Sequence, residues 1–524
     1  MLAPGSRLGL GALLGLLAGG VAIGVGELVA AMVRPAASPI IAVGNRLILL
    51  TPEPLKRWAI RQFGTGDKHA LLTGIYAGLA VLAVLVGVLA LRRLVYGLIG
   101  IALLGAVGSY SALTAHAHRG SDAVPSVLGA LAGMAALVLL VRTVTGTAFE
   151  PRPAGALVAD RRRFLQGGLA AGGLAVFGGF GGRALQHNRF NANAARSAIT
   201  LPAPVSSVGP VPAGGSAPLG GQTNFDLGKS GVPFLTPAQS FYRIDTALSV
   251  PQLDPKNWSL RIHGKVKQEL RISYQQLLAR PLVERWITLN CVSNEVGGNL
   301  IGNARFRGVL LAELLREAGI DPAADQLVAT SSDGMTIGSP TAVVMDGRDA
   351  MLAVGMNGEP LPVAHGFPVR MVVPGLYGYV SACKWLVDLE ATTFADYQAY
   401  WVRGGWAQRG PVRLASRIDR PAGSGRIAVG SQLAVAGVAW DQHVGVSKVE
   451  VRADNDDWQQ AVLAPVPSTD TWRQWVWLWT PRTAGVHRLT VRAYDGHGTV
   501  QDPAPADPFP AGATGYHTVT VTAH

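Results

Sequence analysis

The stretch "RWITLNCVSNEVGG", residues 285–298, contains one of the two cysteines of this 524-residue chain. The residues before the cysteine alternate and are rich in β-branched and aromatic side chains, which predicts a β-strand. Cys291 follows at the end of that strand, where the chain enters a turn rich in Asn and Gly. Side chains at such positions are accessible and often functional. The stretch therefore predicts a chemically active cysteine at a strand end.

The two cysteines, Cys291 and Cys383, allow two interpretations. Outside the cytoplasm they can form a disulfide. Alternatively, one thiol is a metal ligand, because a thiolate is a soft donor whose pKa a metal lowers greatly. The strand-end position of Cys291 favours the metal ligand.

Five blocks of sequence resemble, in the same order, the molybdopterin-binding domain of the sulfite oxidase family. No single block would be enough to identify the family, but the occurrence of all five in the same order makes coincidence unlikely. The blocks are "FYRIDTALSVPQLDPKNWSLRIHGKV" (241–266), "ITLNCVSNEVGG" (287–298), "NARFRGVLLAELL" (303–315), "MNGEPLP" (356–362) and "HGFPVRMVVPG" (365–375) followed by "YGYVSACKWL" (377–386).

The resemblance implies a mononuclear molybdenum held by one molybdopterin dithiolene and one protein cysteine, which matches Cys291. The pterin carries a phosphate, and a buried dianion needs fixed donors, which suits an Arg fork better than a mobile lysine. The positions that the resemblance implies as further cofactor contacts are Tyr242, Arg243, Ser332 or Asp333, His365, Arg370, Ser381 and Lys384.

The residues after Cys291 depart from the sulfite oxidases, which resemble "CAGN" followed by arginines. Here the sequence is "VSNEV", which places Glu295 where a cation would help to hold sulfite. Coulomb repulsion disfavours an anion there. We therefore expect oxygen-atom transfer to or from a small substrate such as sulfite or a sulfoxide, with methionine-sulfoxide-type reduction as an alternative. An alternative of another class is a non-catalytic, membrane-tethered binding protein.

The first part of the chain is apolar enough to predict a membrane domain at residues 1–182. A bilayer core needs about 20 helical residues. Stretches of that length occur at 8–33, 69–91, 94–115, 123–141 and 164–182. The shorter stretch 36–50 carries Arg46 and is predicted to be interfacial or re-entrant, although a sixth span stays an alternative. The net charge of +12 is interpreted mainly as membrane topology rather than nucleic-acid binding, since no run of five or six Lys/Arg occurs.

The segment "RRRFLQ", residues 161–166, precedes the last apolar stretch and resembles a twin-arginine export signal. Such signals normally lie at the N-terminus. Molybdopterin is inserted in the cytoplasm, so a domain that carries it must cross the membrane already folded. The alternative is that the arginines only anchor a helix as positive-inside residues. Cation positions predict that residues 183–524 lie outside the cytoplasm, although the cations at 56–68 argue against that orientation.

Three regions follow the membrane domain in this prediction. Residues 183–235 are rich in Ala, Pro, Gly and Ser, a composition typical of a linker. Residues 236–408 form the α+β molybdopterin-binding domain. Residues 409–524 alternate in short runs between turns, which predicts an immunoglobulin-like β-sandwich. The resemblance implies that this sandwich is of a dimerisation type, so a homodimer is expected.

Electrons must reach the cofactor from another carrier. The histidines of the membrane half, His69, His116 and His118, fall near span ends rather than as facing pairs. They are therefore not predicted to hold a haem. We expect a separate electron carrier, contact with membrane lipid, and a small oxo-acceptor or oxo-donor as substrate.

Overall fold

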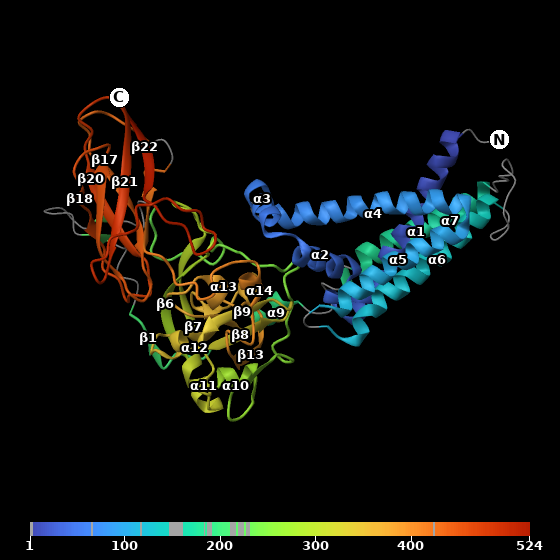
Figure 1. Cartoon of the computed structure of the whole chain (residues 1–524), viewed down its shortest axis with the longest axis horizontal. Helices are drawn as coiled ribbons and strands as arrows, with labels where there is room; N and C mark the ends of the chain where they lie inside the picture. The colour runs from blue at the N-terminus through green and yellow to red at the C-terminus, as the bar shows by residue number, and fades with distance from the viewer. Residues whose placement is uncertain are drawn as a thin grey trace. The chain divides into compact units, whose positions relative to one another are not determined.

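The structure, a computed structural model, describes residues 4–63, 66–115, 118–145, 161–182, 184–185, 191–209, 216–217, 225–226, 231–422 and 425–524. The chain divides into two compact units (Figure 1). The first consists of residues 1–191 with the short segment 246–250. The second consists of residues 192–245 and 251–524.

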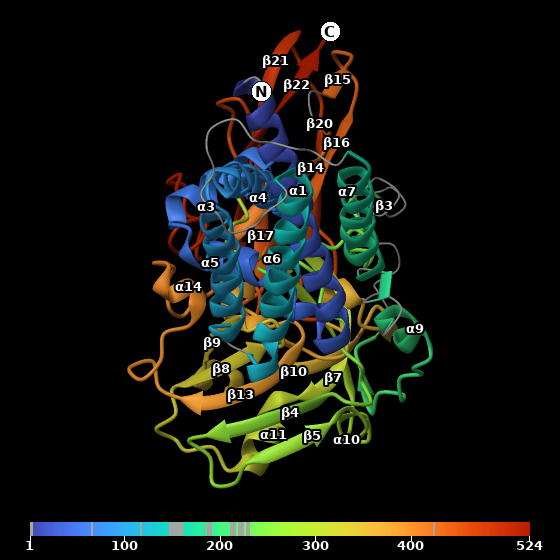
Figure 2. The ribbon, with the colours of Figure 1, turned by 90° about the vertical axis from the view of Figure 1, so that its right-hand side faces the viewer.

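The first unit is a helix bundle in which α1 packs against α4, α6 and α7, as Figure 2 also shows. Many glycines lie where these helices meet, and a Cβ on Gly15 would lie 1.9 Å from the backbone oxygen of Ala83. Small residues permit this close approach of helix backbones. The long helices are α1 (Pro4–Val33), α4 (Asp67–Arg92), α5 (Leu94–Leu113), α6 (Val124–Thr145) and α7 (Arg161–Val176), which continues as a π-helical turn, η4 (Phe177–Gly181).

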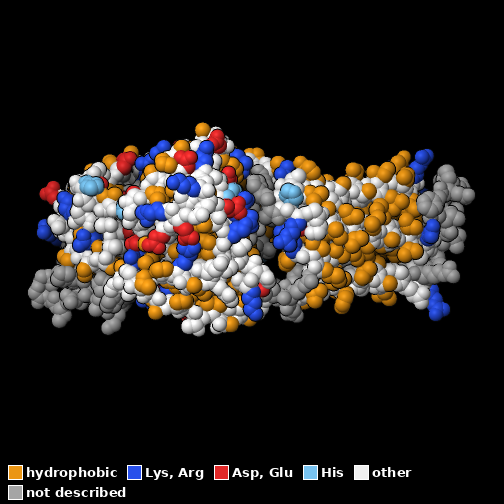
Figure 3. Space-filling model, turned by 90° about the horizontal axis from the view of Figure 1, so that it is seen from below, with side chains coloured by type: hydrophobic (Ala, Val, Ile, Leu, Met, Phe, Trp, Pro, Cys, Tyr) orange, Lys and Arg blue, Asp and Glu red, His pale blue; other side chains and the backbone are white. Residues whose placement is uncertain are grey.

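Five helices of this unit are long and apolar enough to cross a membrane, and they coincide in place with the five predicted stretches. Figure 3 shows apolar side chains covering the visible face of these helices. The stretch predicted as interfacial or re-entrant forms the shorter helix α2 (Pro39–Leu50). The helix α3 (Glu53–Phe63) follows and carries part of the cationic stretch 56–68. Its apolar and cationic side chains recur every three to four residues, which is the spacing of an amphipathic helix.

Two buried carboxylates of the first unit, Glu27 and Asp122, have polar partners. Ser38 donates to the buried Glu27 carboxylate over 2.6 Å. Arg34, just after α1, forms an ion pair with the buried Asp122, with 2.8 Å between Nε and Oδ1. These contacts satisfy charges that would be costly in an apolar surrounding.

The molybdopterin-type part of the second unit is α+β, as predicted. Two sheets enclose one apolar core together with the helices α10 (Tyr274–Leu278) and α11 (Leu311–Ala318). The first sheet contains β1 (Ser206–Ser207), β6 (Val283–Asn290), β7 (Ile301–Leu310), β10 (Met351–Met356), β11 (Glu359–Pro360) and β12 (Arg370–Val372). The second sheet contains β5 (Leu270–Ser273), β4 (Ser259–Gly264), β13 (Leu386–Thr392), β8 (Gln326–Ser331) and β9 (Thr336–Pro340).

The C-terminal part is a β-sandwich of two sheets, as the alternating sequence predicts. On β20 (Arg473–Trp479), Trp475, Trp477 and Trp479 lie at period two and share the sandwich core. One sheet contains β14 (Ala415–Arg420), β16 (Leu433–Trp440), β20 and β19 (Val462–Leu463). The other contains β15 (Gly425–Ile427), β22 (His517–Ala523), β21 (Gly485–Asp495), β17 (Val446–Ala453) and β18 (Gln459–Gln460).

The two parts of the second unit also share a core of their own. Trp472, which precedes β20, packs there with Phe234, Trp286 of β6 and Trp440 of β16. Burial of large aromatic side chains is a main source of stability in such cores. The strand that leads to Cys291 is therefore packed against the sandwich.

Parts of the segment predicted as a linker belong to this unit, so that prediction was wrong at several places. Residues 192–197 form the helix α9 (Ala192–Ser197), and β1 pairs with the start of β6. Val232 and Phe234 are buried in the shared core. The composition alone predicts neither helix nor strand here, and tertiary contacts supply the sheet partner of β1 and the buried neighbours of Val232 and Phe234. Much of residues 210–230 lies outside the described residues.

Candidate cofactor site

Cys291 follows directly after the last residue of β6. Its N–H donates to the carbonyl of Leu300 over 2.9 Å, and its side chain is buried. Burial raises the pKa of the thiol, while a hydrogen bond from Ser293 opposes this. A buried thiol of this kind becomes an effective ligand when a bound cation stabilises its thiolate. Cys291 and Cys383 are both free thiols, so the disulfide interpretation was wrong.

A group of buried cationic side chains lies close to this thiol. Arg370 in β12 is 5% exposed, and its Nη1 donates to the carbonyl of His365 over 3.2 Å. Burial lowers the pKa of Arg370 to about 10. Its Nε is buried without a hydrogen-bond partner. A buried guanidinium with an unused donor is suited to an anion.

Lys384 is the second buried cation of this group. Burial lowers its pKa to about 8, despite an ion pair of 2.6 Å with Asp245, and Arg370 lowers it further. Asp245 also pairs with Arg243 over 2.8 Å. Because Arg370 and Lys384 repel each other, an anion bound between them would stabilise the charge of both.

His365 is buried beside these cations. Burial, together with Arg370 and Lys384, lowers its pKa to about 4, so the ring is neutral at pH 7. Its Nε2 lies 3.1 Å from the carbonyl of Ala238. A neutral ring that donates Nε2–H to that carbonyl keeps Nδ1 as an acceptor.

Gly366 explains how these residues approach one another. It adopts φ +109°, and a Cβ there would lie 3.0 Å from Cβ of Arg370 and 3.2 Å from Cα of Lys384. A side chain would be strained by this conformation and would separate the two cations.

Tyr242 connects the thiol with the cations. Burial raises its pKa, and the nearby Cys291 raises it further, whereas Arg370 lowers it. Its ring stacks on Phe241, with 5.3 Å between the ring centroids. The structure thus brings Tyr242, Arg243, His365, Arg370 and Lys384 into the neighbourhood of Cys291.

The remaining predicted contacts divide into two kinds. The Ser332 hydroxyl is buried without a hydrogen-bond partner, and Asp333 accepts from the N–H of Met335 over 3.1 Å. Ser381, in contrast, is fully buried and bonds at 3.0 Å to the carbonyls of Leu376 and Tyr377. Its hydroxyl stabilises its own turn, so the geometry gives it a structural role that its block of sequence did not reveal.

A pocket lined by residues on both sides of Cys291 includes several residues that sequence reasoning missed. Oδ1 of Asn290 and Nε1 of Trp440 are both buried without a hydrogen-bond partner. Burial raises the pKa of Tyr377 to about 12, and this hydroxyl accepts the N–H of Arg413 over 3.3 Å. The lining residues are Asn290, Asn294, Glu295, Val296, Gly297, Tyr377, Arg413, Leu414, Ala415, Ser416, Trp440, Gln501, Ala513, Thr514 and Gly515. No local signal could have found the residues after 409, because they come from the sandwich.

A buried thiol at a strand end, beside a cluster of buried cations, is the kind of site in which a protein can hold an anionic cofactor. Residues 247–401 match the family described as "Oxidoreductase molybdopterin binding domain", and residues 415–491 match a bacterial Ig domain.

Individual relatives agree with this match. The chain is 31% identical to the uncharacterized oxidoreductase YuiH of Bacillus subtilis, over 30% of this chain and 76% of that protein. It is 30% identical to mitochondrial sulfite oxidase of Mus musculus, over 44% of this chain and 49% of the mouse protein. It thus spans about half the length of the sulfite oxidase. The solved structure of the sulfane dehydrogenase SoxCD from Paracoccus pantotrophus is 24% identical with a TM-score of 0.47, over 56% of this chain and 83% of that chain.

The chain belongs to the sulfite oxidase family of molybdopterin-dependent oxidoreductases. It is therefore an enzyme whose cofactor is molybdenum bound to molybdopterin. The alternative of a non-catalytic binding protein is not supported.

The residues present fit this cofactor. The partnerless Nε of Arg370 and the partnerless Ser332 hydroxyl are unused donors, and Lys384 adds a positive charge whose pKa a phosphate would raise. Hydrogen-bond donors and cations of this kind are what a buried phosphate dianion requires.

Proposed function

We propose that this enzyme transfers an oxygen atom to or from a small substrate, with Cys291 as the protein ligand of molybdenum. The observation that carries the proposal is the buried free thiol at the end of β6 beside the cations Arg370 and Lys384. The side chains that would hold the pterin are those of Arg370, Lys384, His365, Arg243, Tyr242 and Ser332. The cofactor, when bound, supplies the two-electron redox chemistry of oxygen transfer. The protein supplies orientation, electrostatics and exclusion of water.

The pocket around Asn290 supports a neutral oxide, such as a sulfoxide, as the substrate. Among the described residues that line it, Arg413 is the one Lys or Arg and Glu295 the one carboxylate. A dianion such as sulfite would meet one cation and one anion there, whereas a neutral oxide needs only hydrogen-bond donors. The buried Nε1–H of Trp440 and the Arg413 guanidinium are such donors.

The substrate class is tested with purified, molybdenum-loaded protein. We expect reduction of methionine sulfoxide with an artificial electron donor, and weak oxidation of sulfite. Glu295→Gln should lower KM for sulfite by about tenfold, because it removes the repulsion, and should leave KM for the sulfoxide nearly unchanged. Asp457→Asn, which neutralises an exposed carboxylate of the sandwich, is the matched control. Efficient sulfite oxidation by the unaltered protein, insensitive to Glu295→Gln, would refute the neutral-oxide assignment.

We further propose that the five apolar helices anchor the protein in the cell membrane and that the catalytic unit lies outside the cytoplasm. Support comes from α7, which begins at Arg161 and runs directly into the apolar helix Phe164–Gly181. Three arginines before Phe-Leu and an uncharged run fit a twin-arginine signal. A cofactor loaded in the cytoplasm requires a route for folded protein.

Export gives the first prediction about the helical unit. Replacement of Arg161, Arg162 and Arg163 by Lys keeps the charge but removes the guanidinium groups that a twin-arginine receptor reads. We expect the catalytic unit to stay protected from protease in spheroplasts. The same exchange at Arg92 and Arg93, a pair at the end of α4, is the control and should leave exposure normal. An active, protease-accessible unit in the triple variant would favour a plain helix anchor.

We propose a separate electron carrier and a homodimer as further partners. His69 is exposed, and Nδ1 of His118 contacts the carbonyl of Ala115 at 2.9 Å, so neither supports haem ligation in this chain. His116 lies outside the described residues. The proposal of a homodimer is based only on the presence of the Ig-like domain.

A further inference from the structure

In the part of the chain that the structure describes, the outer edge of β6, the strand that leads to Cys291, is met first by β1 and further along by the sandwich. On this side β1 pairs only with Val283 and Glu284. Further along, the N–H of Thr288 donates to the carbonyl of Asp470 over 2.9 Å. The Thr288 carbonyl accepts from Nε2 of Gln442 over 3.3 Å. Both backbone groups of Thr288 are thus satisfied by the C-terminal domain.

The Thr288 side chain is held by the same domain. Its Oγ1 accepts the N–H of Trp472 over 2.8 Å and donates to Oδ1 of Asn303 over 3.0 Å. Thr288 is 2% exposed, Trp472 is 4% exposed and Asn303 is fully buried. Loss of this hydroxyl would leave a buried donor and a buried acceptor unpaired.

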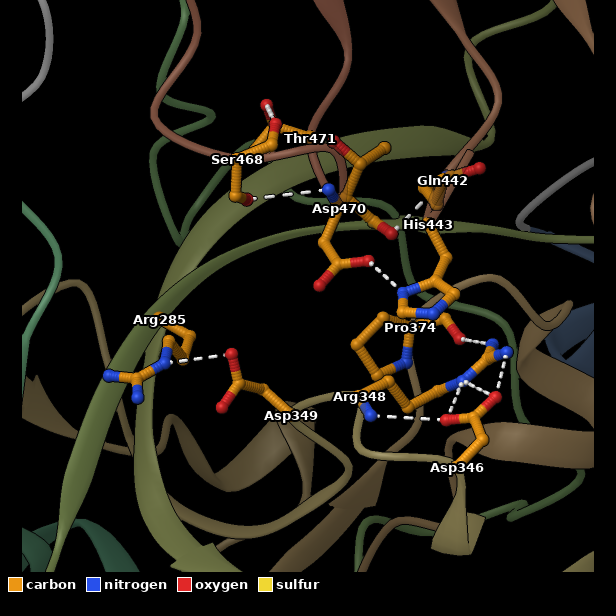
Figure 4. A network of polar contacts seen from close by, with 11 residues as sticks. Arg285, Asp346, Arg348, Asp349, Pro374, Gln442, His443, Ser468, Asp470 and Thr471 are labelled. Atoms are coloured by element: carbon orange, nitrogen blue, oxygen red, sulfur yellow. Dashed lines mark hydrogen bonds and ion pairs between the residues drawn. The ribbon is translucent and has the colours of Figure 1, made fainter. Parts of the chain in front are cut away.

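The two sandwich loops that reach Thr288 are joined to each other, as Figure 4 shows. Nδ1 of His443 lies 3.2 Å from Oδ1 of Asp470, and the His443 N–H donates to the carbonyl of Thr469. On the molybdopterin side, Arg285 of β6 pairs with Asp349 over 2.8 Å. The contact at Thr288 is therefore one point in an ordered polar network rather than an isolated bond.

A second contact holds the loop after Cys291. Nη1 of Arg417 donates to the carbonyl of Gly298 over 2.7 Å. Gly297, at φ +76°, packs so closely on His517 that a Cβ would lie 2.3 Å from the ring. Burial lowers the pKa of His517 to about 4, so the ring is neutral and its Nδ1 accepts the N–H of Ile418.

We infer that the Ig-like domain is a positioning module for the molybdenum ligand, because it fixes the backbone on both sides of Cys291. The positioning residues are Thr288 in β6, which the sandwich loops hold, and Arg417 in β14 of the sandwich. A ligand thiolate must be held in one geometry to tune the metal, and groups that orient a ligand act through it. The role as a ligand rests on the function proposed above, whereas the two contacts themselves do not.

Hydrogen exchange on the full-length protein tests the inference. In Thr288→Val, amides of residues 286–298 should exchange about tenfold faster, because local opening no longer costs the lost hydrogen bonds. Thr288→Ser keeps Oγ1 and should restore protection. Arg417→Gln should raise exchange mainly in residues 294–300. Thr490→Val, which removes a 3.0 Å hydroxyl pair with Thr518 between β21 and β22, is the matched control and should leave 286–298 unchanged.

A second readout uses the loaded protein. The thiolate-to-molybdenum charge-transfer absorption should shift in Thr288→Val and return in Thr288→Ser. Exchange that is unchanged at 286–298, or that rises equally throughout the second unit, overturns the positioning role. Faster local exchange without any charge-transfer band would instead contradict Cys291 as the ligand, so the two failures can be told apart.

Discussion

Cys291→Ser should lose turnover while the second unit stays folded. A hydroxyl is a hard, weakly acidic donor of nearly the same volume as the thiol, so packing changes little while the redox electronics of the metal change. We expect the pterin to be retained at least in part, and activity to fall by about a thousandfold or more, as is typical when a group essential to the chemistry is removed. Molybdenum content, pterin content and turnover, measured on the same preparation, check this result.

Cys383→Ser is the matched control for this experiment. Cys383 is 1% exposed, burial raises its pKa, and its Sγ contacts the carbonyl of Lys384 at 3.7 Å. It lies beside the buried cations but is not at the position that matches the ligand. The control should keep substantial activity. Equal loss of activity in both variants, each with full molybdenum, would remove the basis for assigning Cys291 as the ligand.

Arg370→Ala should cost retention of the cofactor. The substitution removes charge-assisted hydrogen bonds worth about 1.5–3 kcal/mol each and leaves a buried dianion underpaired. One such bond corresponds to a loss of affinity of about tenfold or more. Pterin released on gel filtration, together with molybdenum per chain, measures the effect.

The control for Arg370 must remove an arginine outside the site. Arg280→Ala breaks only a partly exposed ion pair of 2.6 Å with Glu317 and should leave cofactor content unchanged. An Arg370→Ala protein that holds its pterin as tightly as the unaltered chain would place the phosphate elsewhere.

The sequence predicted those parts of the site whose signal is local. Alternation before Cys291 predicted the strand, and the five ordered blocks predicted the cations that the structure brings near the thiol. The same reasoning could not show that the Ser381 hydroxyl bonds to its own turn, because such a hydroxyl looks in sequence like one that is free. It also missed Asp245, whose pairing with Lys384 depends on segments 139 residues apart.

Other features could not be predicted because they depend on tertiary contacts. Trp440 and Arg413 line the pocket from a domain that begins more than a hundred residues after Cys291. The Pro- and Ala-rich segment before residue 235 has no internal pattern that predicts burial, yet Phe234 is 4% exposed because other strands surround it. Composition predicts how a segment behaves alone, whereas burial is decided by what packs on it.

The core shared by the two parts of the second unit has a consequence for biosynthesis. Phe234, Trp286 and Trp472 meet in this core, so the surroundings of Cys291 are complete only when a segment more than 180 residues downstream has been synthesised. A ribosome delivers residues in order, and the cofactor therefore cannot be enclosed in its final environment while translation of the sandwich is still under way. Enclosure of the cofactor therefore requires synthesis of the chain at least as far as Trp472.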